Sequence, residues 1–319
     1  MNKEKESVCA VVVTYNRKEL LIECLEALRK QVRPIQGIYL IDNASTDGTP
    51  DLLLEKGYLG KLPPENLTEP WEKEFKIENL TDGKSIKLHY VRMHENTGGA
   101  GGFHEGVKRA YEKKYDWLWL MDDDTIVDKN SINELLNAVT LLQQKNIKPG
   151  FLCSKVLWID RNPHLMNLPS IKPIVNKVPF NQFEDEGLIV VEAASFVSLL
   201  VHREIVSNVG LPIKEFFIWG DDVEFTLRIT RRVNWGIYVK KSIVYHKTRV
   251  NYTAMDVNDW RVYYYIRNNL YICKKYNKKK YFFLLLWNLI NFLFKKKKLS
   301  VIRGCLDSLI FDPKIELVK

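Results

Sequence analysis

The chain has 319 residues, of which 46% are hydrophobic and 27% charged, as is ordinary for a soluble globular protein. This composition excludes a mostly disordered chain, a collagen-like chain and a polytopic membrane protein. The five cysteines lie far apart without a C-x-x-C pair, which predicts reduced cytosolic thiols and neither a disulfide framework nor a zinc knuckle. The N-terminus carries no signal-peptide pattern, so we expect a cytoplasmic protein.

The formal net charge of +9 is distributed unevenly along the chain. Residues 240–319 hold 18 Lys and Arg against 5 Asp and Glu, whereas the first 239 residues hold 30 against 34. The chain is therefore a mildly acidic body with a basic C-terminal part.

An apolar, aromatic-rich stretch of 14 residues (281–294) lies in this basic part, between the sequences KKYNKKK and KKKK. As a helix it would be about 21 Å long, which is short of the ~30 Å hydrocarbon core of a bilayer. We interpret it as an interfacial helix on an anionic leaflet, with lysines at the headgroups and apolar side chains below them. A core or oligomer-interface helix is the alternative. Nucleic-acid binding is the weakest interpretation, because apolar side chains separate the lysine runs.

The N-terminal part alternates between apolar runs, polar loops and helical patterns. Residues 8–13 are apolar and β-branched, end in the sequence TYNR, and are followed by a helical period of apolar residues over 20–28. A second apolar run, 38–41, ends in the polar loop 42–48 before a short helical pattern. This order predicts a parallel sheet covered by helices, with ligands bound at the carboxyl ends of its strands.

Further along the chain, residues 59–86 are polar and carry Pro and Gly, so we expect a surface insertion there. No internal repeat and no independent second domain is evident before about residue 255. The remaining expected elements are, in chain order, a strand at 87–93, a glycine-rich loop, a helix at 104–114, a strand at 117–121, a helix from about 131, strands near 151–157 and 188–201, an aromatic and acidic block at 216–229, a strand at 236–245 and a basic helical tail.

Three adjacent aspartates, Asp122, Asp123 and Asp124, directly follow the strand at 117–121. Like charges at this spacing raise one another's pKa unless a cation lies between them. Asp122 and Asp124 alternate along the chain and can reach one side, where their hard oxygen ligands suit Mg²⁺ or Mn²⁺ bridging a diphosphate. The alternative is a solvated turn with helix-capping acids. The apolar strand that leads into the acids favours the metal site.

The glycine-rich segment ENTGGAGGF follows the third strand. A dinucleotide fingerprint would lie after the first strand of a βαβ unit, and the first strand here ends without glycines, which argues against nicotinamide binding. Glycines after the third strand permit a tight turn or let the backbone approach a ligand closely.

Two further acids and one histidine are candidates for chemistry. Asp221 and Asp222 follow the aromatic run 216–219, with Glu224 two residues further on. Carboxylates beside aromatic side chains suit a general base with a raised pKa, and the alternative is an acidic helix N-terminus. His246 ends the apolar strand at 236–245, where a histidine is either a structural residue or a ligand.

Taken together, the sequences VVVTYNR, IDNASTDGT, ENTGGAGGF, WLWLMDDDT, FFIWGDDVEF and VYH resemble, in this order, the motifs of glycosyltransferase family 2. The resemblance covers roughly residues 8–270. It implies the α/β GT-A fold, with a mostly parallel sheet flanked by helices, and a nucleotide-diphosphate-sugar donor. The glycine-rich segment, W-G-D-D-x-E and W-x-x-Y-Y-Y-I-R-N (260–268) resemble bacterial galactofuranosyltransferases more narrowly, and rhamnosyltransferases of surface polysaccharide synthesis more loosely.

The resemblance also implies roles for individual residues. Asp42 would accept a hydrogen bond from the uracil imide, and Asp222 would be the catalytic base, with Asp221 beside it. Asp122, Asp124 and His246 would bind the divalent metal, Mn²⁺ or Mg²⁺. The complete donor site would consist of Thr14, Tyr15, Arg17, Asp42, Asn43, Asn96, Gly98, Gly99, Asp122, Asp123 and Trp219.

These roles imply an inverting, metal-dependent glycosyltransferase of cell-surface glycan synthesis. It would move galactofuranose from UDP-galactofuranose, the favoured donor, onto a lipid-linked or polysaccharide acceptor. The expected organisation is a catalytic domain over 1–255 and a basic, helical, membrane-associating extension over 256–319. The protein would lie peripherally on the anionic inner face of the cell membrane, without a nucleic-acid partner and with its oligomeric state open.

Two other functions remain as alternatives. One is a rhamnosyltransferase that uses dTDP-rhamnose, and the other is a non-catalytic, membrane-tethered subunit that binds nucleotide sugars. The sequence also departs from the family pattern. Tyr265 stands where the mycobacterial type of galactofuranosyltransferase has a histidine, that enzyme's large flanking domains are missing, and residues 59–86 have no counterpart.

Overall fold

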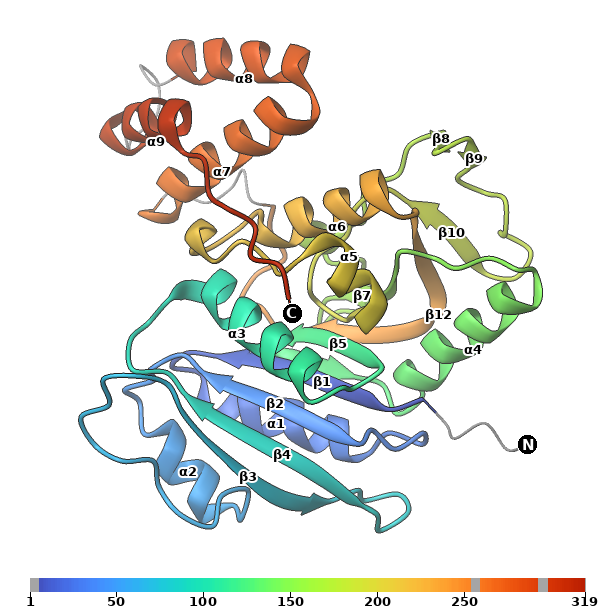
Figure 1. Ribbon diagram of the computed structural model, residues 1–319, viewed down its shortest axis with the longest axis vertical. Helices are drawn as coiled ribbons and strands as arrows, with labels where there is room; N and C mark the ends of the chain where they lie inside the picture. The colour runs from blue at the N-terminus through green and yellow to red at the C-terminus, as the bar shows by residue number, and fades with distance from the viewer. Residues whose placement is uncertain (1–5, 254–258, 292–297, 319) are drawn as a thin grey trace.

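The computed structural model describes residues 6–253, 259–291 and 298–318. These residues form a mixed sheet covered by helices on both faces, with three helices at one end of the long axis of the molecule (Figure 1). The elements of the N-terminal half are β1 (Val8–Thr14), α1 (Lys18–Arg29), β2 (Gly37–Asp42), α2 (Thr49–Glu55), β3 (Trp71–Glu78), β4 (Ser85–Arg92), α3 (Gly98–Glu112), β5 (Trp117–Asp122), β6 (Thr125–Val127) and α4 (Ser131–Gln144).

The C-terminal half adds shorter strands and the helical extension. Its elements are β7 (Phe151–Leu157), η1 (Leu165–Asn167), β8 (Ile174–Val175), β9 (Val178–Pro179), β10 (Leu188–Val191), β11 (Leu199–His202), α5 (Arg203–Val209), η2 (Lys214–Phe216), α6 (Asp221–Arg232), β12 (Gly236–His246), α7 (Arg261–Tyr276), α8 (Lys278–Asn291) and α9 (Lys298–Ile310).

Ten of the described strands form one sheet in the order β10-β12-β7-β11-β5-β1-β2-β4-β3, with β6 paired to β12. At its centre, β1 runs parallel to both β2 and β5, and their carboxyl ends are level. Thr14 pairs with Asp42, and Val13 pairs with Asp122. Because parallel strands bring their carboxyl ends to one edge, the polar loops after β1, β2 and β5 meet there.

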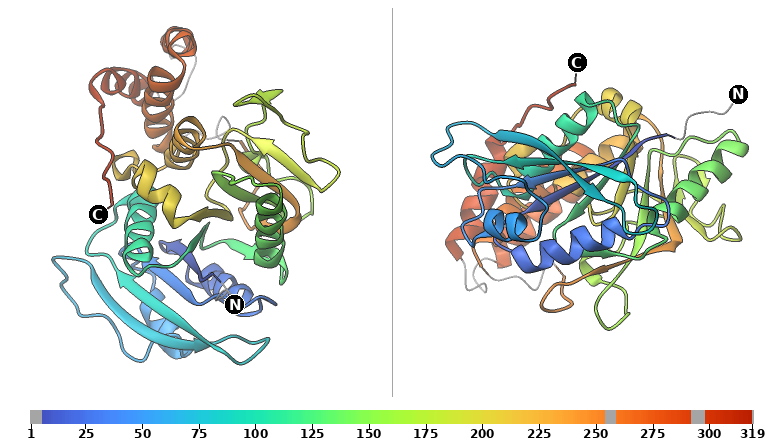
Figure 2. Two further views of the ribbon diagram at one scale, coloured as in Figure 1. Left: turned by 45° about the vertical axis from the view of Figure 1, so that its right-hand side comes forward. Right: turned by 90° about the horizontal axis from the view of Figure 1, so that it is seen from below.

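Both faces of the central strands are buried, as their nearly continuous apolar sequences predict. Successive side chains of a strand point to opposite faces. Ala10 and Val12 of β1 therefore belong to a core with α1 and α4. Val11 and Val13 belong to a second core with α3, α5 and α6. The sheet is thus the middle layer of a three-layer α/β/α domain, seen from two further directions in Figure 2.

The glycine-rich segment is the first turns of a helix, which differs from the predicted loop before residue 104. The helix α3 already begins at Gly98. A Cβ on Gly102 would lie 2.5 Å from Cγ1 of Val13, closer than any real contact. The glycines therefore allow α3 to pack directly on β1, a packing role that sequence reasoning did not assign to them.

The segment 59–86 also contains more structure than the predicted surface insertion. Its residues 71–78 form β3, which pairs antiparallel with β4 along eight residues at the edge of the sheet. Half of the residues of β3 are polar and exposed, as is usual for an edge strand, so no apolar run marks it in the sequence. The predicted strand at 188–201 is likewise two strands, β10 and β11, which pair at different places in the sheet.

The C-terminal extension is helical, as predicted, and consists of α7, α8 and α9. Beyond α9 the chain returns to the α/β/α domain (Figure 1), where the Leu211 N–H donates to the Glu316 carbonyl. The predicted boundary at residue 255 lies outside the described residues, and so do residues 292–297, at the end of the predicted interfacial stretch. None of the helices that the described residues form is long and apolar enough to cross a membrane.

Candidate active site

The three aspartates lie where β5 ends and are held by the loop after β1. The Thr14 hydroxyl donates to Oδ2 of Asp123 over 2.7 Å. The Arg17 guanidinium lies 3.4 Å from Asp123 and 2.5 Å from Asp124. Thr14 is itself buried. It therefore acts on the site through Asp123, whereas the half-exposed Arg17 remains accessible to a ligand.

Asp122, Asp124 and His246 come together as the sequence predicts. One ligand atom from each lies within 4.8 Å of the others. Nδ1 of His246 lies 2.8 Å from Oδ1 of Asn167, an acceptor, so Nδ1 carries a proton and Nε2 faces the aspartates, where it is available to a metal ion or to a second proton. Asn167 is a supporting residue that sequence reasoning missed, because nothing in its local sequence marks it.

The geometry of this cluster fits a divalent cation. Nε2 of His246 lies 2.9 Å from Oδ1 of Asp124, and this buried oxygen accepts no hydrogen bond from the described residues. Two electron-rich atoms at this distance repel each other unless a proton or a metal ion lies between them. Two carboxylates with one imidazole are a suitable ligand set for Mn²⁺ or Mg²⁺, with further positions left for diphosphate oxygens.

The pKa values of the three aspartates are shifted from the usual value, in different directions. Burial, reinforced by the neighbouring Asp124, raises the pKa of Asp122. Burial also raises the pKa of Asp123 to about 7, against the attraction of Arg17. His246 and Arg17 outweigh burial at Asp124 and lower its pKa to about 2. A bound dication would favour the ionised form of all three.

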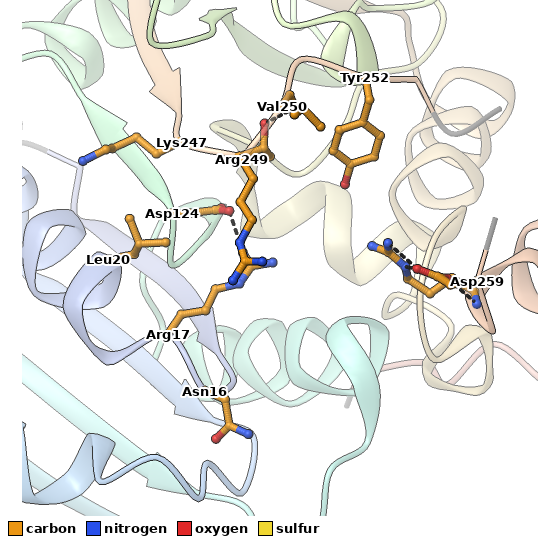
Figure 3. Close-up of a pocket in the computed structure, with 11 residues that line it drawn as sticks. Asn16, Arg17, Leu20, Asp124, Lys247, Arg249, Val250, Tyr252 and Asp259 are labelled. Carbon is orange, nitrogen blue, oxygen red and sulfur yellow. Dashed lines mark hydrogen bonds and ion pairs between the residues drawn. The ribbon is translucent and has the colours of Figure 1, made fainter. Parts of the chain in front are cut away.

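A pocket of about 660 Å³ opens beside this cluster. Arg17, Asp124 and Arg249 line it, together with Lys247 and Arg261 (Figure 3). Lys247 is paired with Glu23 and Arg261 with Asp259. Figure 3 shows Arg17 and Arg249 directed into the same space from opposite walls. Two guanidinium groups beside a cluster of candidate metal ligands are suited to a diphosphate.

The predicted uracil acceptor, Asp42, is completely buried. Its Oδ1 accepts from the Ser45 N–H, and its Oδ2 accepts from Tyr90 and Arg92 at 2.7 Å each. In this structure Asp42 therefore anchors the loop after β2. Tyr15, by contrast, is exposed at the end of β1 and can reach a ligand.

Asn43, Asn96 and Gly98 form one hydrogen-bonded group. The Asn43 side-chain amide donates to Oδ1 of Asn96 and to the carbonyl of Gly98, at 3.0 and 2.9 Å. Gly98 has a φ of 72°, and a Cβ there would lie 2.0 Å from the Phe217 carbonyl oxygen. The neighbouring Gly99 has open space on its Cβ side. Of the two predicted donor-site glycines, only Gly99 offers room for a ligand.

Asp221 and Asp222 open the helix α6, close enough to Asp122 for its charge to raise the pKa of both. Burial is the largest cause, and it raises the pKa of Asp222 to about 6. Glu224 is different, because Arg228, Lys275 and Tyr276 all bond to its carboxylate. Asp222 is therefore the accessible base candidate, and Glu224 joins α6 to α7.

The aromatic residues before Asp221 are held in strained conformations by α7. Phe217 and Trp219 have φ angles of 63° and 66°, which bulky residues rarely adopt. The buried amide of Asn268 donates to the carbonyls of Phe216, Ile218 and Trp219, at 2.7 to 3.1 Å. The sequence pattern alone assigned no role to the R-N of W-x-x-Y-Y-Y-I-R-N. Tyr265 of the same motif packs edge-on against Trp219.

The sheet, the acid cluster and the basic pocket have the arrangement of the GT-A fold. The Glycosyl transferase family 2 model matches residues 9–58 and 72–185, just over half of the chain. The chain belongs to this family. The unmatched residues between the two parts lie within the predicted insertion.

Two relatives have been named as galactofuranosyltransferases. The chain is 28% identical over 233 residues to galactofuranosyltransferase GlfT1 of Mycolicibacterium smegmatis, covering 71% of this chain and 66% of that protein. It is 27% identical over 230 residues to GlfT1 of Mycobacterium tuberculosis, covering 71% and 65%. The chain therefore spans slightly less than two thirds of the length of these relatives.

Solved structures confirm the fold. The S. aureus TarS 1-349 structure with UDP-GlcNAc has a TM-score of 0.54 at 14% identity, covering 95% of this chain and 79% of that one. The structure of GalNAc-T7 with UDP, GalNAc and Mn²⁺ has a TM-score of 0.58 at 15% identity, covering 85% and 48%. Identities this low show a shared fold alone.

Proposed function

We propose that this protein is an inverting, metal-dependent glycosyltransferase that transfers galactofuranose from UDP-galactofuranose onto a lipid-linked or polysaccharide acceptor. The observation that carries the proposal is the meeting of Asp122, Asp124 and His246 with Asp222 at one edge of the sheet, beside a basic pocket. The first three residues are suited to a metal ion that would bind the donor's diphosphate, and the fourth is suited to the acceptor's hydroxyl.

The donor's diphosphate would lie in the pocket between Arg17 and Arg249. Asp122, Asp124 and His246 would hold Mn²⁺ or Mg²⁺, which when bound neutralises charge on the departing nucleoside diphosphate. The two guanidinium groups add hydrogen bonds to the same oxygens. Tyr15, which is exposed, and Gly99, which has open space on its Cβ side, would contact the nucleoside or the sugar.

Asp222 would be the general base. Its pKa of about 6 leaves it ionised at neutral pH, yet basic enough to accept the acceptor's proton as the new glycosidic bond forms. A single displacement, with the hydroxyl attacking opposite to the leaving diphosphate, inverts the anomeric carbon. Trp219, fixed by Asn268, would present its aromatic ring to a sugar beside the base.

The two GlfT1 relatives support galactofuranose as the transferred sugar and cell-surface glycan synthesis as the setting. The solved structures that contain UDP, UDP-GlcNAc and Mn²⁺ support a uridine nucleotide and a divalent metal. We place the protein at the cytoplasmic face of the membrane, where a lipid-linked acceptor would be met.

A donor panel tests the proposal. Purified protein with Mn²⁺ or Mg²⁺ is mixed with UDP-galactofuranose, UDP-galactopyranose, UDP-glucose or dTDP-rhamnose, and donor hydrolysis and thermal shift are followed, with EDTA as the control. We expect metal-dependent hydrolysis with UDP-galactofuranose alone. Selection of dTDP-rhamnose would overturn the choice of sugar and leave the rest, whereas donor binding without turnover would indicate a non-catalytic subunit.

A further inference from the structure

The helices α7, α8 and α9 enclose a small core of their own. It is made of Val262, Ile266, Leu270, Cys273, Tyr281, Val301 and Cys305. α7 lies against the catalytic domain, whereas α8 lies at the far end of the long axis of the molecule (Figure 1). Of these three helices, α8 therefore has the least contact with the rest of the protein, and its outer face needs an explanation.

The outer face of α8 is apolar and unusually exposed. Its large side chains Phe282, Phe283, Leu286, Trp287 and Ile290 are each more than half exposed. Their spacing places them on one side of the helix, since residues three and four apart are neighbours on a helix surface. On the opposite side, Tyr281 is buried in the small core. An aromatic and aliphatic stripe of this size on a soluble surface marks an interaction site.

The charged residues on α8 and next to it along the chain are all positive. Lys278, Lys279 and Lys280 at the start of α8 are exposed. Lys279 precedes Phe282 by three residues and Phe283 by four, so it lies on the same side of the helix. The sequence from 260 to 306 contains 12 Lys and Arg and no Asp or Glu. The complementary surface must therefore be apolar and negatively charged at the same time.

We propose that the outer face of α8, defined by Lys279, Phe282, Phe283, Leu286, Trp287 and Ile290, docks on an anionic lipid bilayer. The helix lies in the plane of the interface, with its aromatic side chains below the headgroups and the lysines among the phosphates. At 14 residues α8 is about 21 Å long and cannot span the bilayer. Leu306, Leu309 and Ile310, near the end of α9, are exposed as well.

A second copy of this chain is a less suitable occupant. In a symmetric dimer the same surface patch meets itself, so the lysine clusters of both copies would face each other without acidic partners. An anionic leaflet instead supplies a negative charge for each lysine, worth about 1 kcal/mol apiece near the surface.

Docking through α8 would bring α7, the helix that leads into it, close to the membrane. Asn268 of α7 holds the Trp219 loop and precedes the end of that helix, Tyr276, by eight residues, or about 12 Å. This consequence for a lipid-linked acceptor rests on the proposed function. The docking surface itself does not, and it is measured without any sugar donor.

The test is co-sedimentation of the full chain with vesicles. Vesicles of phosphatidylcholine mixed equally with phosphatidylglycerol are compared with pure phosphatidylcholine. We expect sedimentation with the anionic vesicles only, and at least a tenfold weaker affinity for the Phe283→Ser/Trp287→Ser variant, because each side chain buries enough apolar surface for about a tenfold effect. Lys279→Glu should also weaken binding, and added salt should do the same.

Matched controls carry the same substitutions elsewhere. Leu168→Ser/Ile171→Ser removes two exposed apolar side chains from the catalytic domain, and Lys76→Glu reverses an exposed charge on β3; both should bind like the parent. Unchanged binding of the α8 variants overturns the proposal. So does a lipid-free dimer that the α8 substitutions dissociate, or equal binding to uncharged vesicles. Circular dichroism confirms that each variant is folded.

Discussion

Nε2 of His246, at the end of β12, lies 2.9 Å from Oδ1 of Asp124, in the turn after β5. The two strands are not neighbours in the sheet, since β7 and β11 separate them. The histidine is aligned by Asn167, so the contact does not depend on a chance rotamer. Because the imidazole is held in place, substitutions of the residues around it can test whether a cation binds between His246 and Asp124.

Substitution of the proposed metal ligand Asp122 should abolish metal binding without destabilising the metal-free protein. Asp122 has a raised pKa and is repelled by Asp124, so Asp122→Asn should leave the metal-free protein as stable as the parent, or more so. The same variant should lose the rise in melting temperature that Mn²⁺ gives to the parent. Differential scanning fluorimetry with Mn²⁺ and with EDTA measures both. Asp160→Asn, an exposed acid, is the control. A full Mn²⁺ response in Asp122→Asn would refute the site.

The base assignment predicts a selective loss of turnover. Asp222→Asn should lower kcat by about 10²- to 10⁴-fold while UDP binding changes little, because a general base acts on the acceptor side. Isothermal titration with UDP and a radiolabelled transfer assay give the two quantities. Glu215→Gln, seven residues earlier in η2 and with an exposed side chain, should behave like the parent. Near-normal turnover in Asp222→Asn would assign the chemistry to another group.

The raised pKa of Asp222 also predicts the pH dependence. Because burial raises this pKa to about 6, the carboxylate is the main form above pH 6, and kcat should fall about tenfold per pH unit below it. The stability of the protein should change with pH in the opposite direction from kcat. The folded protein holds this proton more tightly than the unfolded chain, so the contribution of Asp222 to stability is lost as pH rises toward and past 6. Asp222→Asn should then be more stable than the parent at pH 7, by about 1–3 kcal/mol. A flat profile between pH 5 and 7 would contradict this.

The Asn268 side chain should matter for both stability and rate. Asn268→Ala removes three hydrogen bonds to buried or half-buried carbonyls, which should cost about 2–3 kcal/mol and release the strained Trp219. We expect kcat to fall while the Mn²⁺ response remains. Asn269→Ala is the matched control on the same helix, since among the described residues that amide bonds within α7, to the Tyr265 carbonyl. Equal effects of the two substitutions would show that the loop is not held this way.

The two glycines at the start of α3 should respond in opposite ways. Gly98→Ala should destabilise the protein strongly, by more than about 2 kcal/mol, because its φ is positive and its Cβ would collide with the Phe217 carbonyl. Gly99→Ala meets open space in a helix and should be neutral or stabilising. If Gly99 lies against the donor, the alanine should still weaken UDP-sugar binding. Chemical denaturation and titration distinguish these effects, and similar stability of the two variants would contradict the geometry.

The pattern of residues predicted most of the fold. Apolar runs of the right length marked β1, β2, β4, β5, β7 and β12, because strands buried on both faces are apolar throughout. The edge strand β3 escaped detection, since an exposed strand has no such run. The start of α3 was also missed, because glycine favours loops in isolation and only its contact with β1 makes it suitable for a helix.

The candidate site shows the same division between sequence and tertiary structure. By itself the sequence determined the family, the parallel sheet covered by helices, and the three acids at a strand end, since these depend on residue type and spacing along one stretch of chain. The tertiary structure alone decided that Asp42 is buried under Arg92, that Glu224 belongs to a structural ion pair while Asp222 remains accessible, and that Asn167 and Asn268 support the site. A side chain's charge and accessibility depend on partners from distant segments, and these partners come into contact with it only when the chain folds.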